Sequence, residues 1–320
     1  SSVIAATWTT LRVSPSAASD VYRVRFAASV LAASASTAIL IPPSIALIVY
    51  SILVPGVDLR ALFAAGLIPG VLAGLAVILP TIFLSRKHDF GAAEDMTRPE
   101  FWPSLRGAVP GLLAPVIILG GLRSGLFTPT EAASVAVAYG FFVGVLVYCN
   151  RSWNDVLSVL AESAETSAVI MIIISLAGLF AWAGSTLGAF DYAAQSILAF
   201  SDNGLVVLIL VMCVLLVAGM ILDGVSIYLI TLPLLVPIAL AFNWNLTWFG
   251  VLMAMNIAIG QFTPPVAVNL MVTARIAKVP IEATVPWILW LMLTMGIAML
   301  LVILFPEIAL WLPRVLGYRV

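Results

Sequence analysis

Two pairs of adjacent prolines stand inside long apolar runs, at "AILIPPSIALIV" (residues 38–49) and "GQFTPPVAVNLM" (residues 260–271). Proline lacks a backbone N–H and clashes with the preceding helical turn, so each pair must interrupt a helix and free carbonyl oxygens. Carbonyl and hydroxyl oxygens suit a hard cation such as Na⁺, and the start of the next half-helix offers N–H groups to an anion. The pairs therefore predict a binding site near the middle of the membrane. The alternative is that they are kinks that only shape helix packing.

Polar side chains gather around both proline pairs, close in sequence to the carbonyl groups that the prolines free. Serine, threonine and asparagine also join membrane helices to one another, at about 0.6 kcal/mol for each hydrogen bond. One such residue does not distinguish a site from helix packing, so the cluster carries the prediction. Its members are Ser34, Ser36, Thr37 and Ser44 near the first pair, and Asn256, Gln261, Thr263 and Asn269 near the second.

Asp223 is the strongest single candidate, because it lies within the apolar run "VAGMILDGVSIYLITLPLLVP". An ionisable side chain inside a membrane segment is costly and is by default a functional hypothesis. Gly219 and Gly224 allow the backbone to unwind beside it, and the hydroxyl of Ser226 follows three residues later. We expect Asp223 to contribute to a sodium site or to hold a helix break open. The alternative is that it caps a helix between two shorter segments.

The segment "GLFTPTEAASVAVAYG" (residues 125–140) predicts a helix start. Thr128 is a suitable cap, Pro129 fits the first turn, and Glu131 suits the positive end of the helix dipole. A direct role of these residues in binding is the less favoured interpretation.

The elements that must position these residues are membrane helices. Of 320 residues, 63% are hydrophobic and 9% are charged, which differs strongly from a soluble domain. About 20 apolar residues are enough to cross a hydrocarbon core about 30 Å thick. The apolar runs do not alternate as the strands of a membrane barrel do, so we expect an all-α polytopic membrane protein. The long runs are 62–84, 126–149, 166–190, 204–222, 224–242, 248–274 and 284–312.

The stretch 108–204 does not give a unique number of crossings. Residues 107–122 are short and interrupted by prolines, and 179–197 carry small residues and Asp191, where a hairpin tip or helix break is expected.

Charge and motif content exclude several functional classes. The net charge is −1 and the basic residues are scattered, so no nucleic-acid partner is expected. The single histidine, His88, lies in a charged segment, and there is no zinc-protease, nucleophile-elbow or P-loop motif. We therefore expect no enzyme, no organic cofactor and no ATP-driven transport by this chain alone. Cys149 and Cys213 are expected as small apolar residues in packed helices.

The spacing of the prolines suggests an internal repeat. Pro264 lies 222 residues after Pro42, and the same offset carries Pro15 onto Pro237. Transporters commonly contain two repeats with interrupted helices at matching places. The predicted organisation is the remainder of a first repeat at 1–85, a cytoplasmic connector at 86–107, and a second repeat at 108–320.

The distribution of basic residues indicates that the two repeats are inverted. The loop at 16–25 carries two arginines whereas its counterpart at 240–247 is uncharged, and the break at 55–58 lacks Lys and Arg whereas 275–280 carries one of each. Since basic loops stay in the cytoplasm, equivalent loops lie on opposite sides of the membrane. Residues 25 and 86 then lie on the same side, and the helix at 62–84 supplies the return crossing, so residues 26–54 must cross the membrane once with a broken helix. A re-entrant hairpin with the prolines at its tip is the alternative.

Five sequence motifs, in their order along the chain, closely resemble those of the large membrane subunit of tripartite ATP-independent periplasmic (TRAP) transporters. The resemblance covers essentially the whole chain. The motifs are "ILIPPSIALIVYS", "AGLIPGVLAGL", "GLFTPTEAASVAVAYG", "AGMILDGVSIYLITLPLLVPIA" and "FGVLMAMNIAIGQFTPPVAVNLMVTARIA".

The resemblance implies an inverted-repeat, elevator-type ion-transporter fold in the bacterial inner membrane, with re-entrant hairpins and Na⁺ as the coupling ion. It also implies three partners besides the lipid bilayer: a small four-helix membrane subunit, a periplasmic solute-binding protein and a small organic anion. C4-dicarboxylates, sugar acids and related carboxylates all fit a polar site near the membrane midplane. A channel or a non-transporting membrane scaffold is the alternative from a different class.

The family's motifs match positions of this chain residue by residue. Together with the polar residues near the breaks, among them Ser226, Asn256 and Asn269, these matches give two sets of candidates. The sodium candidates are Ser1, Ser2, Asp223, Ser226, Gly260 and Thr263. The substrate candidates are Pro42, Pro43, Ser44, Asn256, Pro264, Pro265 and Asn269.

Two departures from the family pattern stand out. The family usually has glycine two residues after its second proline pair, where this chain has Ala267. The family's subunit also begins well before "SS" (residues 1–2), and the chain opens without an initiator methionine or a basic signal segment. We therefore expect that an N-terminal part is missing and that the first repeat is incomplete.

Overall fold

The computed structural model describes residues 18–88, 90, 100–147 and 153–320, and within these ranges every regular element is a helix. Contacts divide the chain into two compact units, one made of residues 1–92 with 191–320 and the other of residues 93–190. The first unit contains both proline pairs and Asp223, so it positions the predicted site.

The helices of the first unit include three long membrane-type segments and several shorter ones. They are α2 (Ala18–Thr37), α3 (Ile45–Leu53), α4 (Leu59–Lys87), α9 (Gly204–Gly219), α10 (Gly224–Ala241), α11 (Leu246–Gly260), α12 (Val268–Ala277), the 3₁₀ turn η2 (Ile281–Thr284), α13 (Val285–Leu304) and α14 (Glu307–Val315). The second unit holds α5 (Phe101–Ser124), α6 (Pro129–Phe142), the π-helical turn η1 (Val143–Val147) and α7 (Trp153–Thr186), and α8 (Ala189–Phe200) starts at the boundary.

Five helical segments of the described chain are long and apolar enough to cross a membrane. Their number and composition confirm the prediction of an all-α polytopic membrane protein. The segments are Leu59–Lys87, Phe101–Ser124, Asp155–Thr186, Gly224–Ala241 and Ile281–Leu304.

Short polar side chains mark where several helices begin. Asp58 accepts a hydrogen bond from the backbone N–H of Arg60 at 2.8 Å at the start of α4. At the start of α6, Thr128 is the expected cap, and together with Glu131 it forms a capping box, in which each side chain accepts from the other's backbone N–H. The prediction of a helix start at this motif is confirmed.

Two apolar segments form helices whose ends differ from those expected from the sequence. Residues 107–122 lie within one continuous helix, α5, although it contains Pro110 and Pro115, since membrane helices tolerate proline where local adjustments re-satisfy the backbone. The run 284–312 is divided between α13 and α14, because Pro306 disfavours a helical conformation of Phe305.

The break expected within 179–197 is confirmed. Helix α7 ends at Thr186 and α8 begins at Ala189, and Gly188 between them has φ 68°, a left-handed conformation that glycine adopts without a steric penalty.

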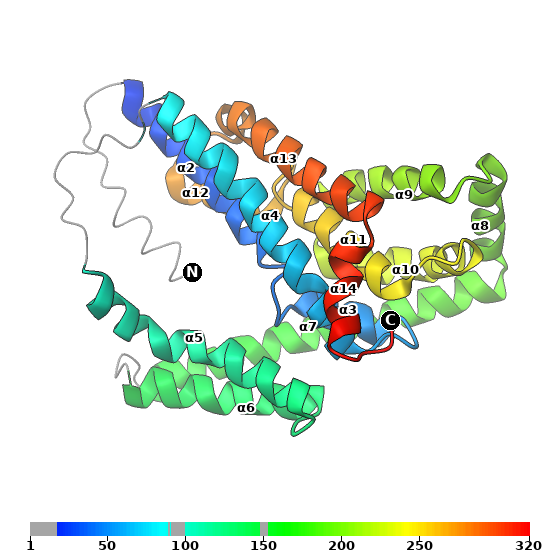
Figure 1. The fold of residues 1–320 in the computed structure, drawn as a ribbon, viewed down its shortest axis with the longest axis horizontal. Coiled ribbons are helices and arrows are strands. Elements are labelled where there is room, and N and C mark those ends of the chain that lie inside the picture. The colour runs from blue at the N-terminus through cyan, green and yellow to red at the C-terminus, as the bar shows by residue number, and fades with distance from the viewer. Residues whose placement is uncertain (1–17, 89, 91–99, 148–152) are drawn as a thin grey trace. The chain divides into compact units, whose positions relative to one another are not determined.

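Helix α11 forms the centre of the first unit, where every residue from Thr247 to Gly260 is buried. It contacts α2, α4, α9, α10 and α13, and Figure 1 shows α13 and α4 running alongside one another. Side-chain hydrogen bonds to backbone carbonyls join these helices. Trp248 Nε1 donates to Val302 O at 2.9 Å, and Thr294 Oγ1 of α13 donates to Ala76 O of α4 at 2.6 Å.

Candidate functional site

Three helix breaks of the first unit contain most of the predicted site residues. The first proline break (residues 38–44) separates α2 from α3, and the second proline break (residues 261–267) separates α11 from α12. The aspartate break (residues 220–223) separates α9 from α10. Both proline pairs therefore interrupt a helix, as predicted, and in both the proline–proline peptide bond is cis.

Ser44 closes the first proline break from within. Its hydroxyl donates to the carbonyl of Ile39, and it accepts from the backbone N–H of Leu47 at 3.4 Å, which caps α3. The side chain is buried, so both interactions are shielded from solvent. Ser44 thus satisfies one carbonyl and one N–H that the break would otherwise leave free.

Helix α4 supports the first proline break through two glycines that lie one turn apart. A Cβ added to Gly66 would lie 2.9 Å from the carbonyl oxygen of Leu40, and one added to Gly70 would lie 3.2 Å from Cγ1 of Ile41. At Gly66 a side chain would collide with the backbone of the break, so α4 and the break are in backbone contact there, and at Gly70 the contact is with the Ile41 side chain.

The prolines leave carbonyl oxygens free at both breaks. In the described part of the chain, no group donates a hydrogen bond to the carbonyls of Pro42, Pro43, Pro264 or Pro265. Pro42 is buried, Pro264 is half-buried, and the second proline of each pair is exposed. These oxygens have the chemistry of ligands for a hard cation.

Asp223 caps α10 at the aspartate break. One carboxylate oxygen accepts from the backbone N–H groups of Val225 (3.0 Å) and Ser226 (3.2 Å), and the other accepts from the Ser226 hydroxyl. The capping role that the sequence left as an alternative is therefore present. A carboxylate has about four acceptor positions, so these bonds leave capacity for a cation.

The aspartate break and the second proline break lie side by side. A Cβ added to Gly260 would lie 2.7 Å from the Cα of Gly219, so the ends of α9 and α11 touch through their backbones. The N–H of Ala267 also donates to the carbonyl of Met220 at 3.0 Å. Thr263 lies in the second proline break and is buried, and its hydroxyl donates to Ile259 O at 2.6 Å.

Asn269 joins the second proline break to the last turn of α2. Its side-chain Nδ2 donates to the buried hydroxyl of Ser36 at 2.8 Å, and its backbone N–H donates to Gln261 O at 3.0 Å. The half of the chain that holds the first proline pair is thereby tied to the half that holds the second.

Asn256 lies inside α11, one turn before Gly260. It is fully buried, and its Nδ2 donates to the backbone carbonyl of Met212 in α9 at 2.7 Å. Its Oδ1 has no hydrogen-bond partner among the described residues.

The structure thus places Asp223 and Thr263 in two adjoining breaks, with Ser226 in the first turn of α10 and Gly260 at the end of α11, and it links Asn269 to α2. The remaining sodium candidates, Ser1 and Ser2, lie outside the described residues.

Sequence reasoning did not single out the glycines that support the first break, or the carbonyl that supports the second. Gly66 and Gly70 form a Gly-x-x-x-Gly pattern in "GLIPG", a known signal for close approach of membrane helices, so they were recognisable. The Met220 carbonyl has no signal in the sequence, because any residue carries one.

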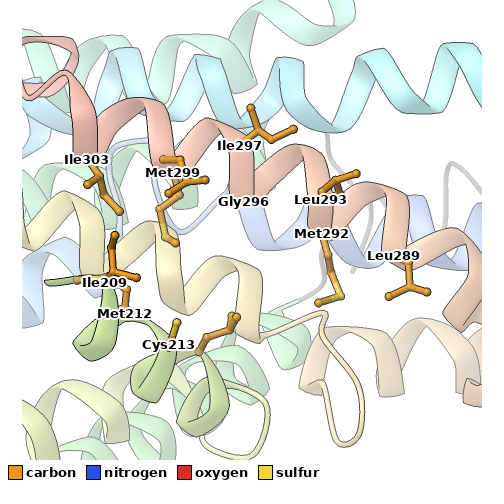
Figure 2. A pocket seen from close by; sticks show the side chains of 12 residues that line it. Ile209, Met212, Cys213, Leu289, Met292, Leu293, Gly296, Ile297, Met299 and Ile303 are labelled. Carbon is orange, nitrogen blue, oxygen red and sulfur yellow. The ribbon is translucent and has the colours of Figure 1, made fainter. Parts of the chain in front are cut away.

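A cavity of about 450 Å³ lies between α9 and α13 in the first unit, apart from the helix breaks. Figure 2 shows the side chains that surround it, among them Met212, Cys213, Met292 and Met299. The lining contains no charged group and no hydroxyl or amide, so the cavity does not suit an organic anion.

Comparison with known proteins agrees with the family resemblance of the sequence motifs. Residues 1–308 match the family described as "Tripartite ATP-independent periplasmic transporter, DctM component". The sialic acid TRAP transporter large permease protein SiaM of Vibrio cholerae is 35% identical over 298 residues, which cover 93% of this chain and 70% of that protein.

Two further relatives differ in the substrate that they are named for. The C4-dicarboxylate TRAP transporter large permease protein DctM of Pseudomonas aeruginosa is 36% identical over 92% of this chain and 69% of its own length. The isethionate TRAP transporter permease protein DctMQ of Oleidesulfovibrio alaskensis is 31% identical over 89% of this chain and 45% of its own length. The chain belongs to the DctM family of large TRAP transporter permeases and is a multi-pass protein of the bacterial inner membrane.

Proposed function

We propose that this chain imports small organic anions by Na⁺-coupled secondary transport, together with a small four-helix membrane subunit and a periplasmic solute-binding protein. The substrates are C4-dicarboxylates or related carboxylates and sugar acids. Membership in the DctM family supports the transport role and the tripartite assembly. The names of the relatives, which include sialic acid and C4-dicarboxylates, support an organic anion.

The observation that carries the proposal is the repetition of one helical pattern. Helix α2, the first proline break, α3 and α4 follow one another in the same order as α11, the second proline break, α12 and α13. This order supports two structural repeats. We propose that the repeats are inverted, with the boundaries 1–85 and 108–320 and a connector at 86–107, and that the site moves by an elevator-type mechanism.

The cation site is proposed at the contact between the aspartate break and the second proline break. Within the described residues, no three His, Cys, Asp or Glu side chains come together. The ligands of a cation at this contact are therefore mainly carbonyl and hydroxyl oxygens, and the carboxylate of Asp223 supplies the negative charge. The proposed ligands come from Asp223, Ser226, Gly260 and Thr263, with Ser1 and Ser2 as further candidates from the first repeat.

The anion site is proposed between the two proline breaks. No side chain caps α12. The N–H of Asn269 already donates to Gln261 O, whereas those of Val268 and Leu270 have no acceptor among the described residues. These two N–H groups and the positive end of the helix dipole are therefore available to an anion. The proposed contributors are Pro42, Pro43, Ser44, Pro264, Pro265 and Asn269. Asn256, the remaining substrate candidate from the sequence, is not included, because it is fully buried inside α11 and its amide donates to Met212 O.

Uptake into proteoliposomes tests this function. The full-length subunit is reconstituted with its small membrane partner, and uptake of a labelled C4-dicarboxylate is followed with and without an inward Na⁺ gradient, with the binding protein added last. We expect uptake only when both Na⁺ and the binding protein are present. Uptake that is indifferent to Na⁺ would contradict ion coupling, and uptake without the binding protein would contradict the tripartite mechanism.

A further inference from the structure

The side chain of Asn256 connects the backbones of two helices deep inside the first unit. Its Nδ2 donates to Met212 O of α9 at 2.7 Å, and the sulfur atoms of Met212 and Met299 lie 3.6 Å and 3.9 Å from the same nitrogen. Figure 2 shows both methionines on the wall of the apolar cavity between α9 and α13. The amide is therefore covered by methionine side chains on this side.

The hydrogen bond of Asn256 joins the same two helices, α9 and α11, as the Gly219–Gly260 contact. Along α11, Asn256 precedes Gly260 by four residues, about one turn, and along α9, Met212 precedes Gly219 by seven residues, about two turns. The hydrogen bond and the glycine contact thus lie in the same order along both helices. Any change in the spacing of α9 and α11 at Asn256 is transmitted to the glycine contact.

An asparagine is a poor choice for packing alone at this position. Its Oδ1 is buried without a hydrogen-bond partner among the described residues, and an unsatisfied buried acceptor destabilises the folded protein. A leucine of similar size would fill the space without this cost. These observations favour a role in which the amide is needed for its hydrogen bond to the Met212 carbonyl.

We propose that Asn256 is a positioning residue: it sets the spacing of α9 and α11 and thereby the geometry of the cation site at the Gly219–Gly260 contact. It acts through the helix backbones and contacts neither the ion nor the substrate. This inference rests on the proposed Na⁺ coupling for its transport readout.

The first test compares Asn256→Leu with Thr294→Val in the reconstituted tripartite system. Thr294 makes a matched hydrogen bond from a side chain to a backbone carbonyl between α13 and α4, away from the three breaks. We expect Asn256→Leu to raise the Na⁺ concentration for half-maximal uptake by about tenfold, as loss of an outer-shell partner does at metal sites. The substrate KM at saturating Na⁺ stays unchanged, and Thr294→Val leaves both values within about twofold. An unchanged Na⁺ dependence, or a changed substrate KM at saturating Na⁺, overturns the proposal.

A second test does not depend on Na⁺ coupling. The loss in Tm caused by Gly219→Ala is measured in the wild-type background and in the Asn256→Leu background, in detergent without Na⁺. A Cβ on Gly219 would lie 3.2 Å from Gly260 Cα, so the cost of this substitution reports the spacing of the two helices. If Asn256 sets that spacing, the loss falls by half or more in the Asn256→Leu background. Equal losses overturn the positioning role, whereas wild-type uptake indifferent to Na⁺ overturns the proposed function alone.

Discussion

In the first proline break, Ser44 caps the following helix and bonds to the carbonyl of Ile39, and the glycines of α4 pack against the backbone. In the second proline break, no side chain caps α12. Instead, the N–H of Ala267 donates to Met220 O of the aspartate break, and Asn269 reaches Ser36 of α2.

The two breaks therefore have the same backbone pattern but different supports. The first break is held mainly by its own serine and one neighbouring helix. The second break is held by two segments that are distant in sequence, so its conformation is coupled to the aspartate break and to α2. We expect substitutions at the second break to affect Na⁺ binding, and substitutions at the first break to affect stability and anion binding while leaving the Na⁺ dependence unchanged.

The largest effect is expected from Gly260→Ala, which forces a Cβ against the backbone of Gly219. Such overpacking between two rigid backbones should lower the stability by about 3 kcal/mol and abolish uptake. Thermal unfolding in detergent measures the loss. Gly74→Ala is the matched control, since a Cβ on Gly74 meets nothing within 4 Å. Equal stability of the two variants would contradict the close contact.

Ser44→Ala should lower the stability by about 1.5 kcal/mol, because it removes the cap of α3 and leaves the Ile39 carbonyl without its donor. The Na⁺ dependence of uptake should stay unchanged, which separates the first break from the second. Thermal unfolding and a Na⁺ titration of uptake provide the two measurements. A shift in the Na⁺ titration as large as the one caused by Thr263→Ala would remove the distinction.

Asn269→Ala should cost about 1 kcal/mol through loss of the bond to Ser36. Because this bond ties α12 to α2, the variant should also reduce uptake at saturating Na⁺. Ser134→Ala provides the control, since the Ser134 hydroxyl is exposed and donates to Thr130 O within its own helix. Uptake by Asn269→Ala equal to that of the control would show that the link is not needed.

The smallest effect is expected from Ala267→Gly. Ala267 has φ 49°, in the left-handed region where a Cβ is unfavourable, so glycine should stabilise the protein by about 0.5 kcal/mol. An increase of about a degree or two in Tm would agree with this expectation for a chain of this length. A clear decrease in Tm would show that the buried methyl group contributes more by packing than it costs in backbone strain.

Much of this architecture was predictable from local sequence. The two proline pairs and the apolar runs predicted interrupted membrane helices, and the Thr-Pro-Thr-Glu motif predicted the start of α6 with Thr128 as its cap. Asp223 was recognised as the exceptional residue of its run, and its capping role was foreseen as an alternative.

The contacts between segments were less predictable. Local patterns do not show that Met220 offers its carbonyl to Ala267, or that Asn269 meets Ser36, because both contacts join segments that are separated along the chain. The positive φ of Ala267 was not predictable either, since alanine disfavours it. The usual glycine at this position in the family indicated only that a special backbone conformation is needed here.

The central claim is that the aspartate break and the second proline break bind Na⁺. The most direct measurement is the Tm of the purified full-length subunit in detergent, titrated with NaCl at constant ionic strength using KCl. A ligand present at about 100 times its Kd stabilises by about 2.7 kcal/mol, so the wild-type Tm should rise with Na⁺ and not with K⁺. Thr263→Ala and Asp223→Ala should abolish the rise, and Ser134→Ala should keep it. A Na⁺-dependent rise that is equal in all four proteins would place the ion elsewhere and contradict the account.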